Sequence, residues 1–119
     1  MTHQISFTQV ENKLLPKFRQ TISQARSTED VKKMFGYNMQ ELFKEVSEGV
    51  LALRLEDVAL EPEAAGYRID DRIRELDAFI KVWNDTDLSR IVDRFAQLSL
   101  HQYAHLAKNP EKTEAKIRR

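Results

Sequence analysis

The sequence predicts an all-α fold, a single-domain bundle of four to five helices. Apolar residues recur at intervals of three and four along most of the 119-residue chain, which is the period of an amphipathic helix. Three of the six glycines and prolines, Gly36, Pro62 and Pro110, lie at predicted helix ends, whereas Pro16, Gly49 and Gly66 need explanations of their own. The chain has the length of one domain, and its 41% hydrophobic and 32% charged residues are typical of a globular protein.

The first predicted helix covers an apolar stripe that runs from Phe7 to Ala25. Ser6 and Gln9 have the spacing of a capping box, in which each side chain accepts a hydrogen bond from a free backbone N–H group. Pro16 lies inside the stripe and removes one intrahelical bond, but the stripe keeps its phase beyond it. We therefore expect one bent helix rather than two.

Two further helices are predicted in the next thirty residues. A short one begins after the capping residue Ser27 and ends at Gly36. The next follows a second capping signal at Asn38 and continues along one apolar face to Leu53. Gly49 lies inside this helix, where it is either tolerated or allows a neighbouring backbone to approach closely.

Residues 50–69 allow two interpretations. In the one we adopt, Pro62 occupies the first position of a helix whose apolar stripe continues to Trp83. In the alternative, Val58–Leu60 and Gly66–Ile69 form a small hairpin, and the fold becomes α+β.

The last helix is predicted to begin after a polar segment, residues 84–87, and to carry a broad apolar face from Leu88 to Leu106. Asn109 and Pro110 stop it. The chain therefore divides into a helical bundle domain, residues 1–109, and a flexible basic tail, residues 110–119.

Composition argues against several classes of function. The absence of cysteine excludes disulfides, thiolate metal sites and cysteine nucleophiles. No apolar run approaches the roughly 20 residues of a membrane helix, and the first residues do not resemble a secretory signal. We therefore expect a cytoplasmic protein without a membrane contact. A net charge of zero also removes the general attraction to nucleic acid, so we expect no nucleic-acid partner.

The charges are nevertheless segregated along the chain. Residues 36–61 contain six acidic and two basic side chains, and Glu41, Glu45 and Glu48 lie on one helix against a single Lys44. Such segregation suits charge-complementary contact with a partner protein or with a second copy of the chain, or it reflects the chance patchiness of a bundle surface. The three glutamates themselves are best explained as a solvated face, since Lys44 and Glu48 have the spacing of a helical ion pair.

One pair of residues suggests chemistry. His101 and His105 lie one helical turn apart, a spacing that can chelate a metal ion. No third ligand is evident, and Arg90 and Arg94 lie beside the pair, where they would repel a cation. Glycine-rich phosphate loops, nucleophile elbows and dinucleotide fingerprints are absent. We therefore name no catalytic residue and expect no cofactor and no small-molecule substrate.

The function predicted from the sequence is that of a small interaction or regulatory module, which binds a partner protein or itself. Three features of the sequence select its candidate residues: a second apolar stripe, tyrosines at the boundaries of elements, and a basic stripe on the last helix. The second apolar stripe means either that its helix is central in the bundle or that a partner covers one side of it. The predicted partner-binding residues are Tyr37, Leu51, Leu55, Val58, Tyr67, Arg90, Arg94 and His101. The alternative is a metal- or small-ligand-binding protein that uses His101 and His105. A third possibility is weak nucleic-acid binding through the basic tail.

Overall fold

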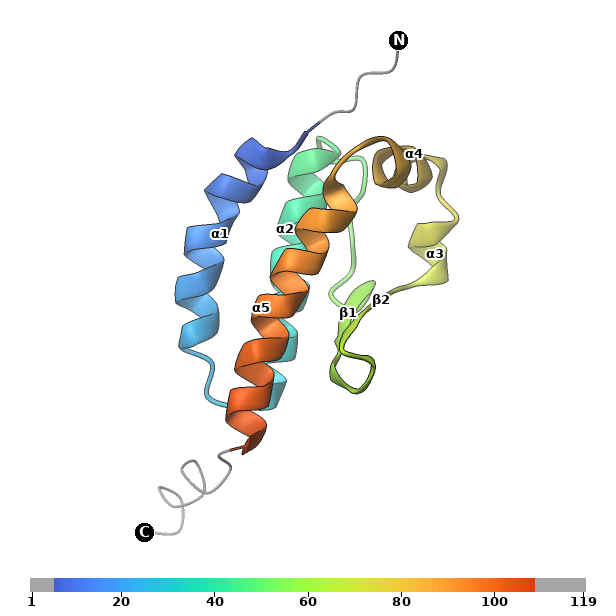
Figure 1. Ribbon diagram of the computed structural model, residues 1–119. Helices are drawn as coiled ribbons and strands as arrows, with labels where there is room; N and C mark the ends of the chain where they lie inside the picture. The colour runs from blue at the N-terminus through green and yellow to red at the C-terminus, as the bar shows by residue number, and fades with distance from the viewer. Residues whose placement is uncertain (1–5, 109–119) are drawn as a thin grey trace, which may run out of the picture.

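The computed structural model describes residues 6–108 and is mainly helical (Figure 1). Its three long helices are α1 (Thr8–Ser23), α2 (Thr28–Val46) and α5 (Leu88–Lys108). Between α2 and α5 the chain forms β1 (Val58–Glu61), the 3-10 turn η1 (Pro62–Ala64), β2 (Gly66–Ile69), α3 (Asp71–Arg74) and α4 (Asp77–Asp85). The helical bundle predicted from the apolar spacing is thus confirmed, with five α-helices in the described residues and a small hairpin added.

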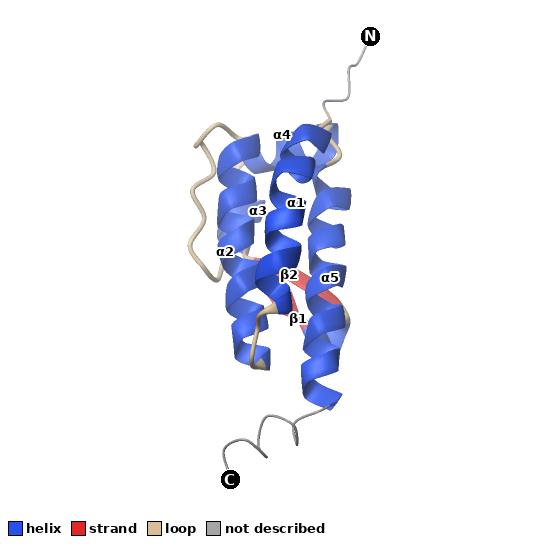
Figure 2. Cartoon of the chain, turned by 90° about the vertical axis from the view of Figure 1, so that its left-hand side faces the viewer, coloured by secondary structure: helices blue, strands red, loops and turns tan. Residues whose placement is uncertain are grey.

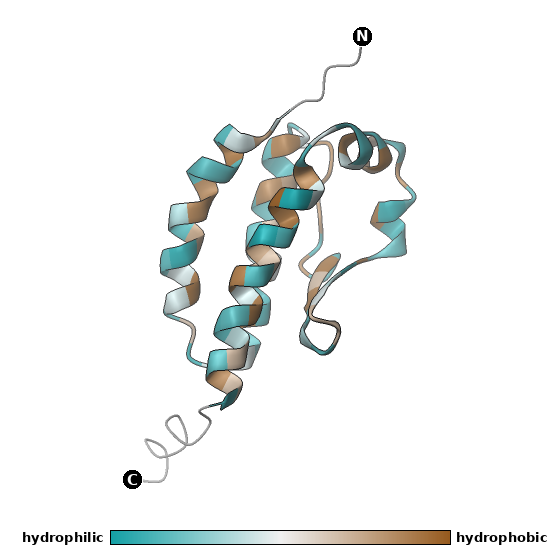
Figure 3. Ribbon diagram, in the orientation of Figure 1, coloured by the Kyte–Doolittle hydropathy of each residue, from teal (hydrophilic) through white to brown (hydrophobic). Residues whose placement is uncertain are grey.

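The long helices form two layers, and the remaining elements form a third. Helices α2 and α5 pack against each other in the middle, and α1 contacts both of them (Figures 1 and 2). The hairpin lies on the opposite side, where β1 contacts α2 and both strands contact α5. The most hydrophobic positions of the helices face inward between these layers (Figure 3).

Aromatic side chains connect the layers. The rings of Phe18 on α1 and Phe95 on α5 meet edge to face, with centroids 5.2 Å apart. Phe43 on α2 stacks on Phe79 of α4 at 6.2 Å, and Phe79 stacks on Trp83 at 5.1 Å. Edge-to-face and offset stacked rings are favourable beyond the area that they bury. These contacts join α4 to the core of the bundle.

Two of the local predictions are confirmed. Helix α1 continues through Pro16 without interruption, so the in-phase apolar stripe did indicate one helix. Helix α2 begins where its capping signal predicted, since the hydroxyl of Ser27 accepts a hydrogen bond of 3.1 Å from the backbone N–H of Asp30.

The predicted helix boundaries at Gly36 and Asn38 are wrong, because α2 runs through both residues. Gly36 is needed for packing: a Cβ at this position would lie 2.7 Å from Cδ1 and 2.8 Å from the carbonyl oxygen of Leu55. The close backbone approach considered for Gly49 therefore occurs at Gly36. Gly49 instead has φ of +89° and lies in the turn that follows α2, so the helix does not continue to Leu53.

The helix predicted from Pro62 to Trp83 is also wrong, and the hairpin is the correct alternative for this segment. Strands β1 and β2 are antiparallel, with Val58 opposite Ile69. Val58 and Leu60 are buried while the residues that follow each of them are only partly covered, which is the two-residue period of a strand. Pro62 opens the 3-10 turn, where its missing N–H is as harmless as it is at a helix start.

A buried carboxylate holds the hairpin to the elements around it. Asp57 accepts a hydrogen bond of 2.7 Å from the backbone N–H of Arg54 and another from the guanidinium of Arg72 on α3. Its carbonyl accepts the N–H of Asp70 at 2.7 Å. These bonds fix the point at which the chain leaves the hairpin for α3.

We expect Gly36→Ala to lower the free energy of unfolding by about 1–3 kcal/mol, because the added methyl group overpacks a contact that includes backbone. The loss should occur although alanine favours an isolated helix by about 1 kcal/mol. Urea denaturation measures the difference. Gly66→Ala is the matched control, since its Cβ would meet no atom closer than 3.8 Å. Equal stability of the two variants would contradict the close-packing role of Gly36.

Candidate functional site

The second apolar stripe predicted to bind a partner lies largely inside the protein. Leu51 and Val58 are each only 1% exposed, and Leu55 is half-buried against Gly36. The chain needs these apolar groups because residues 51–58 run along α2 on their way to the hairpin. Leu51 and Val58 are therefore core residues in this structure and do not form a surface.

The two predicted tyrosines lie in different environments. Tyr37 is 60% exposed on α2. Tyr67 is half-buried in β2, where burial raises the pKa of its phenol and the nearby carboxylate of Asp93 adds to that effect. Arg74 opposes the rise but does not cancel it. Of the pair, only Tyr37 has the exposure that the prediction required.

Arg90 and Arg94, predicted as a partner-binding stripe, bind a carboxylate of the same chain. Arg90 donates a hydrogen bond to one oxygen of Glu11 at 3.4 Å, and Arg94 donates to the other at 3.3 Å. The side chain of Glu11 is only 3% exposed, and a buried carboxylate needs such partners to offset its lost hydration. Sequence reasoning missed Glu11, although its position four residues after Phe7 and three before Leu14 places it on the apolar face of α1.

Asp87 extends this contact to the first residues of α1. Its carboxylate accepts hydrogen bonds from the backbone N–H of Phe7 at 2.8 Å and from the hydroxyl of Ser6 at 2.9 Å. Partial burial by itself would raise the pKa of Asp87. These two bonds and a longer one from Arg90 lower the pKa by more than burial raises it, so the net shift is downward. We call Glu11, Asp87, Arg90 and Arg94 the α1–α5 clamp.

The clamp replaces the capping box that was predicted for the first helix. Helix α1 begins at Thr8, and its Ncap residue, Phe7, has no side chain that could cap the helix. The hydroxyl of Ser6 accepts only a long bond of 3.3 Å, from the N–H of Thr8. The predicted Ser6–Gln9 pairing is therefore wrong, because Phe7 and not Ser6 is the Ncap residue, and the hydroxyl of Ser6 donates to Asp87.

The predicted histidine pair lies on the C-terminal half of α5. His101 is exposed and lines a shallow groove of about 500 Å³ together with Arg90, Asp93 and Arg94. Within residues 6–108, no group of three or more His, Cys, Asp or Glu side chains is placed to hold a metal ion. The structure thus supplies no third ligand for His101 and His105 from the described part of the chain. Residues 110–119, the predicted nucleic-acid-binding tail, lie outside it.

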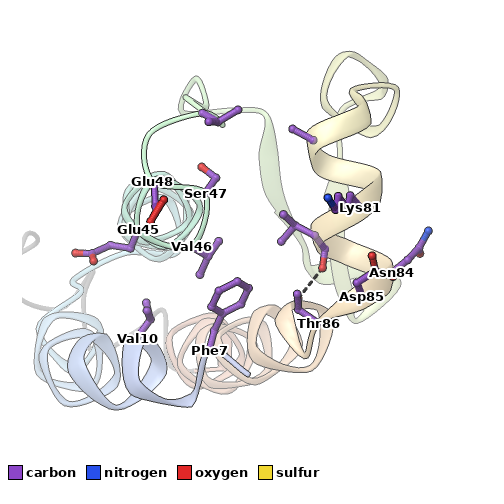
Figure 4. Close-up of a pocket in the computed structure, with 13 residues that line it drawn as sticks. Phe7, Val10, Glu45, Val46, Ser47, Glu48, Lys81, Asn84, Asp85 and Thr86 are labelled. Carbon is purple, nitrogen blue, oxygen red and sulfur yellow. Dashed lines mark hydrogen bonds between the residues drawn. The ribbon is translucent and has the colours of Figure 1, made fainter. Parts of the chain in front are cut away.

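A cavity of about 970 Å³ opens at the end of the bundle where α1 begins and where α2 and α4 end (Figure 4). We call it the end pocket. Its apolar lining consists of Phe7, Val10, Val46, Val50, Ala78 and Val82. Its polar lining consists of Glu45, Ser47, Glu48, Lys81, Asn84, Asp85 and Thr86.

The two hydroxyl groups of the end pocket are already engaged. Ser47 donates to the carbonyl of Phe43 at 2.6 Å and accepts the N–H of Leu51 at 2.8 Å. Thr86 makes the same two kinds of bond to the backbone of α4 and α5, at 2.6 and 3.1 Å (Figure 4). A hydroxyl whose proton is donated to a carbonyl is not activated as a nucleophile. The end pocket is therefore suited to binding apolar groups.

The turn after α2 places an apolar side chain at the rim of the end pocket. Glu48 and Gly49 both have positive φ, +54° and +89°, and reverse the chain direction there. Val50 follows them and is 69% exposed. Sequence reasoning assigned Val50 to the inner face of a longer helix. The signal that could have corrected this was Gly49, read as a helix end rather than as a residue inside the helix.

The chain was compared with known proteins, and no family model, curated protein or solved structure matches it. Among the described helices, none has the length and apolar character needed to cross a membrane. The geometry of the end pocket and its surroundings is therefore the basis for a functional hypothesis.

We expect Asp87→Asn to reduce the free energy of unfolding by about 1–2 kcal/mol at pH 7, because charge-assisted bonds to Phe7 and Ser6 are lost. The folded pKa of Asp87 lies below its unfolded value of about 3.9, so its contribution is complete above that pH. The contribution is then lost as the pH falls through the folded pKa. Urea unfolding at pH 7, 5 and 3 should show the two proteins converging at the lowest pH.

Glu63→Gln provides the control for this measurement, because Glu63 is exposed and forms no ion pair with any described residue. Its stability should follow that of the wild type at each pH. A difference between Asp87→Asn and the wild type that did not change with pH would show that the charge of Asp87 is not what the clamp uses.

Proposed function

We propose that this chain is a small binding module that holds an apolar segment of a partner protein in the end pocket. The observation that carries the proposal is the composition of the pocket. Six of its thirteen lining residues are apolar, its two hydroxyl groups are internally satisfied, and Val50 stands exposed at its rim. Each apolar group that a partner buries there is removed from water, which is the main favourable term in association.

The size of the end pocket supports the proposal. Pockets that take small ligands measure about 300–1,000 Å³, and this cavity lies at the upper end of that range. It is lined by residues of three segments, 7–10, 45–50 and 78–86, so several side chains of one partner segment could enter it together. The predicted regulatory role and cytoplasmic location stay predictions, and a second copy of the chain is the competing occupant.

A selection of peptides tests the proposal without a known partner. A library of random 16-residue helical peptides is displayed and selected against the full chain, and the selected peptides are titrated by fluorescence anisotropy. We expect Val50→Asn to weaken their binding about three- to tenfold, because an amide replaces an apolar group at the rim. Ala78→Gln, which places a larger polar group inside the pocket, should weaken binding further.

Tyr37→Asn is the matched control, because it also exchanges an exposed apolar side chain for an amide but lies outside the end pocket. Peptide affinity should not change in this variant. If Tyr37→Asn weakened binding and Val50→Asn and Ala78→Gln did not, the docking site would lie elsewhere on the molecule. Thermal unfolding of all variants checks that the fold is intact.

A further inference from the structure

We infer that the partner segment of the end pocket is basic, with apolar side chains that enter the pocket and flanking Lys or Arg residues that bind its rim. This inference rests on the proposed function and specifies the chemistry of the partner. Three observations support it: the excess of carboxylates at the rim, the helix C-termini that lie there, and the internal ion pairs, which leave some of those carboxylates unpaired.

The rim of the end pocket has an excess of acidic side chains. Glu45, Glu48 and Asp85 line it against a single cation, Lys81. Glu45 is already paired with Lys13 on α1, at 2.6 Å. Glu48 and Asp85, both exposed, form no ion pair with any residue between 6 and 108. These two carboxylates outnumber Lys81, so the mouth of the apolar cavity has an excess of negative charge.

The helix ends add to this negative charge. Helices α2 and α4 both end at the pocket, and the C-terminus of a helix carries a partial negative charge of about half an elementary unit. Basic residues are favourable in the last turn of a helix, yet the last turn of α4 has none and its final residue is Asp85. In α2, Lys44 stands in the last turn beside Glu45, and Glu48 follows directly. The C-terminal charge of α4 is therefore not offset by a basic residue in its own last turn, and that of α2 is offset by Lys44 alone.

The N-termini of α1 and α5 carry partial positive charge at the same end of the bundle, but they do not compensate for the negative charge at the end pocket. Helix α1 begins there, but the carboxylate of Asp87 accepts the N–H of Phe7, and Glu11 lies in its first turn. At the start of α5, the hydroxyl of Thr86 accepts the N–H of Leu88. The arginines of the α1–α5 clamp face Glu11 and Asp87. The uncompensated charge at the end pocket is therefore negative.

A cationic flank on the partner would remove this imbalance. Lysine or arginine side chains reach several ångströms beyond an apolar segment, so they can meet Glu48 and Asp85 while the segment fills the pocket. Exposed ion pairs of this kind are weak and salt-sensitive, and they act more on partner choice than on total affinity. Two such pairs should be worth about three- to tenfold in affinity at low salt.

A matched pair of peptides tests the inference. One peptide obtained by the selection described above is synthesised twice, with two lysines or with two glutamates at each end of the same apolar core. We expect the lysine form to bind the wild type at least threefold more tightly at 20 mM salt, with the difference shrinking at 500 mM salt. We expect the double variant Glu48→Gln/Asp85→Asn to lose this preference, with a melting temperature at or slightly above that of the wild type, because negative charge is removed beside two helix C-termini.

The outcomes separate the inference from the function on which it rests. Equal binding of the two peptides to the wild type, with Val50→Asn and Ala78→Gln still weakening both, would overturn the basic partner and leave the end pocket as a docking site. Binding that neither pocket variant affects would overturn both proposals. A wild-type dimer in light scattering that Ala78→Gln converts to a monomer would also overturn the inference, because a second copy would then fill the pocket. The salt dependence on the wild type stands as a second test if the double variant does not fold.

Discussion

The buried carboxylate of Glu11 is the constraint on which the arrangement of this end of the molecule depends. It lies between α1 and α5 and accepts hydrogen bonds from both Arg90 and Arg94. Asp87, just before α5, makes a second contact between the two helices by accepting the N–H of Phe7. Because these bonds join the first turns of the two helices, they also fix the ring of Phe7 at the wall of the end pocket (Figure 4). A long-range ionic contact thereby sets the position of an apolar group.

A second constraint acts on the opposite side of α2. Residues 51–58 must run back along this helix to reach the hairpin, and they can do so only where the helix has no side chain in the way. Gly36 provides that place, since the carbonyl oxygen of Leu55 lies where its Cβ would be. The hairpin then packs on α2 and α5, and the chain leaves it at Asp70 toward α3 and α4. The stacked rings of Phe43 and Phe79 complete this path by fixing α4 beside the end of α2.

These two constraints explain which parts of the fold the sequence predicts and which it does not. Signals that act within one turn, such as the cap at Ser27 and the phase of the stripe across Pro16, were read correctly. Gly36 was misread because a glycine that ends a helix and one that admits a neighbouring chain look alike in sequence. The end pocket was not found at all, since its walls come from segments about forty residues apart along the chain. Val50 could be placed there only after α2 was known to end at Val46.

The basic stripe of α5 shows why charge patterns in a sequence need their partners before they indicate a function. Arg90 and Arg94 were predicted to bind a partner, but both face Glu11 and are used within the chain. The acidic residues of the α2 segment looked like an ordinary solvated face. Glu48, just after α2, and Asp85, the last residue of α4, nevertheless form no ion pair within residues 6–108, and the two helix ends add to their negative charge. Once the internal ion pairs are taken into account, the unpaired charge lies at the end pocket and not on α5. The charge left over after folding is negative and borders the apolar pocket, so a basic segment is the better complement.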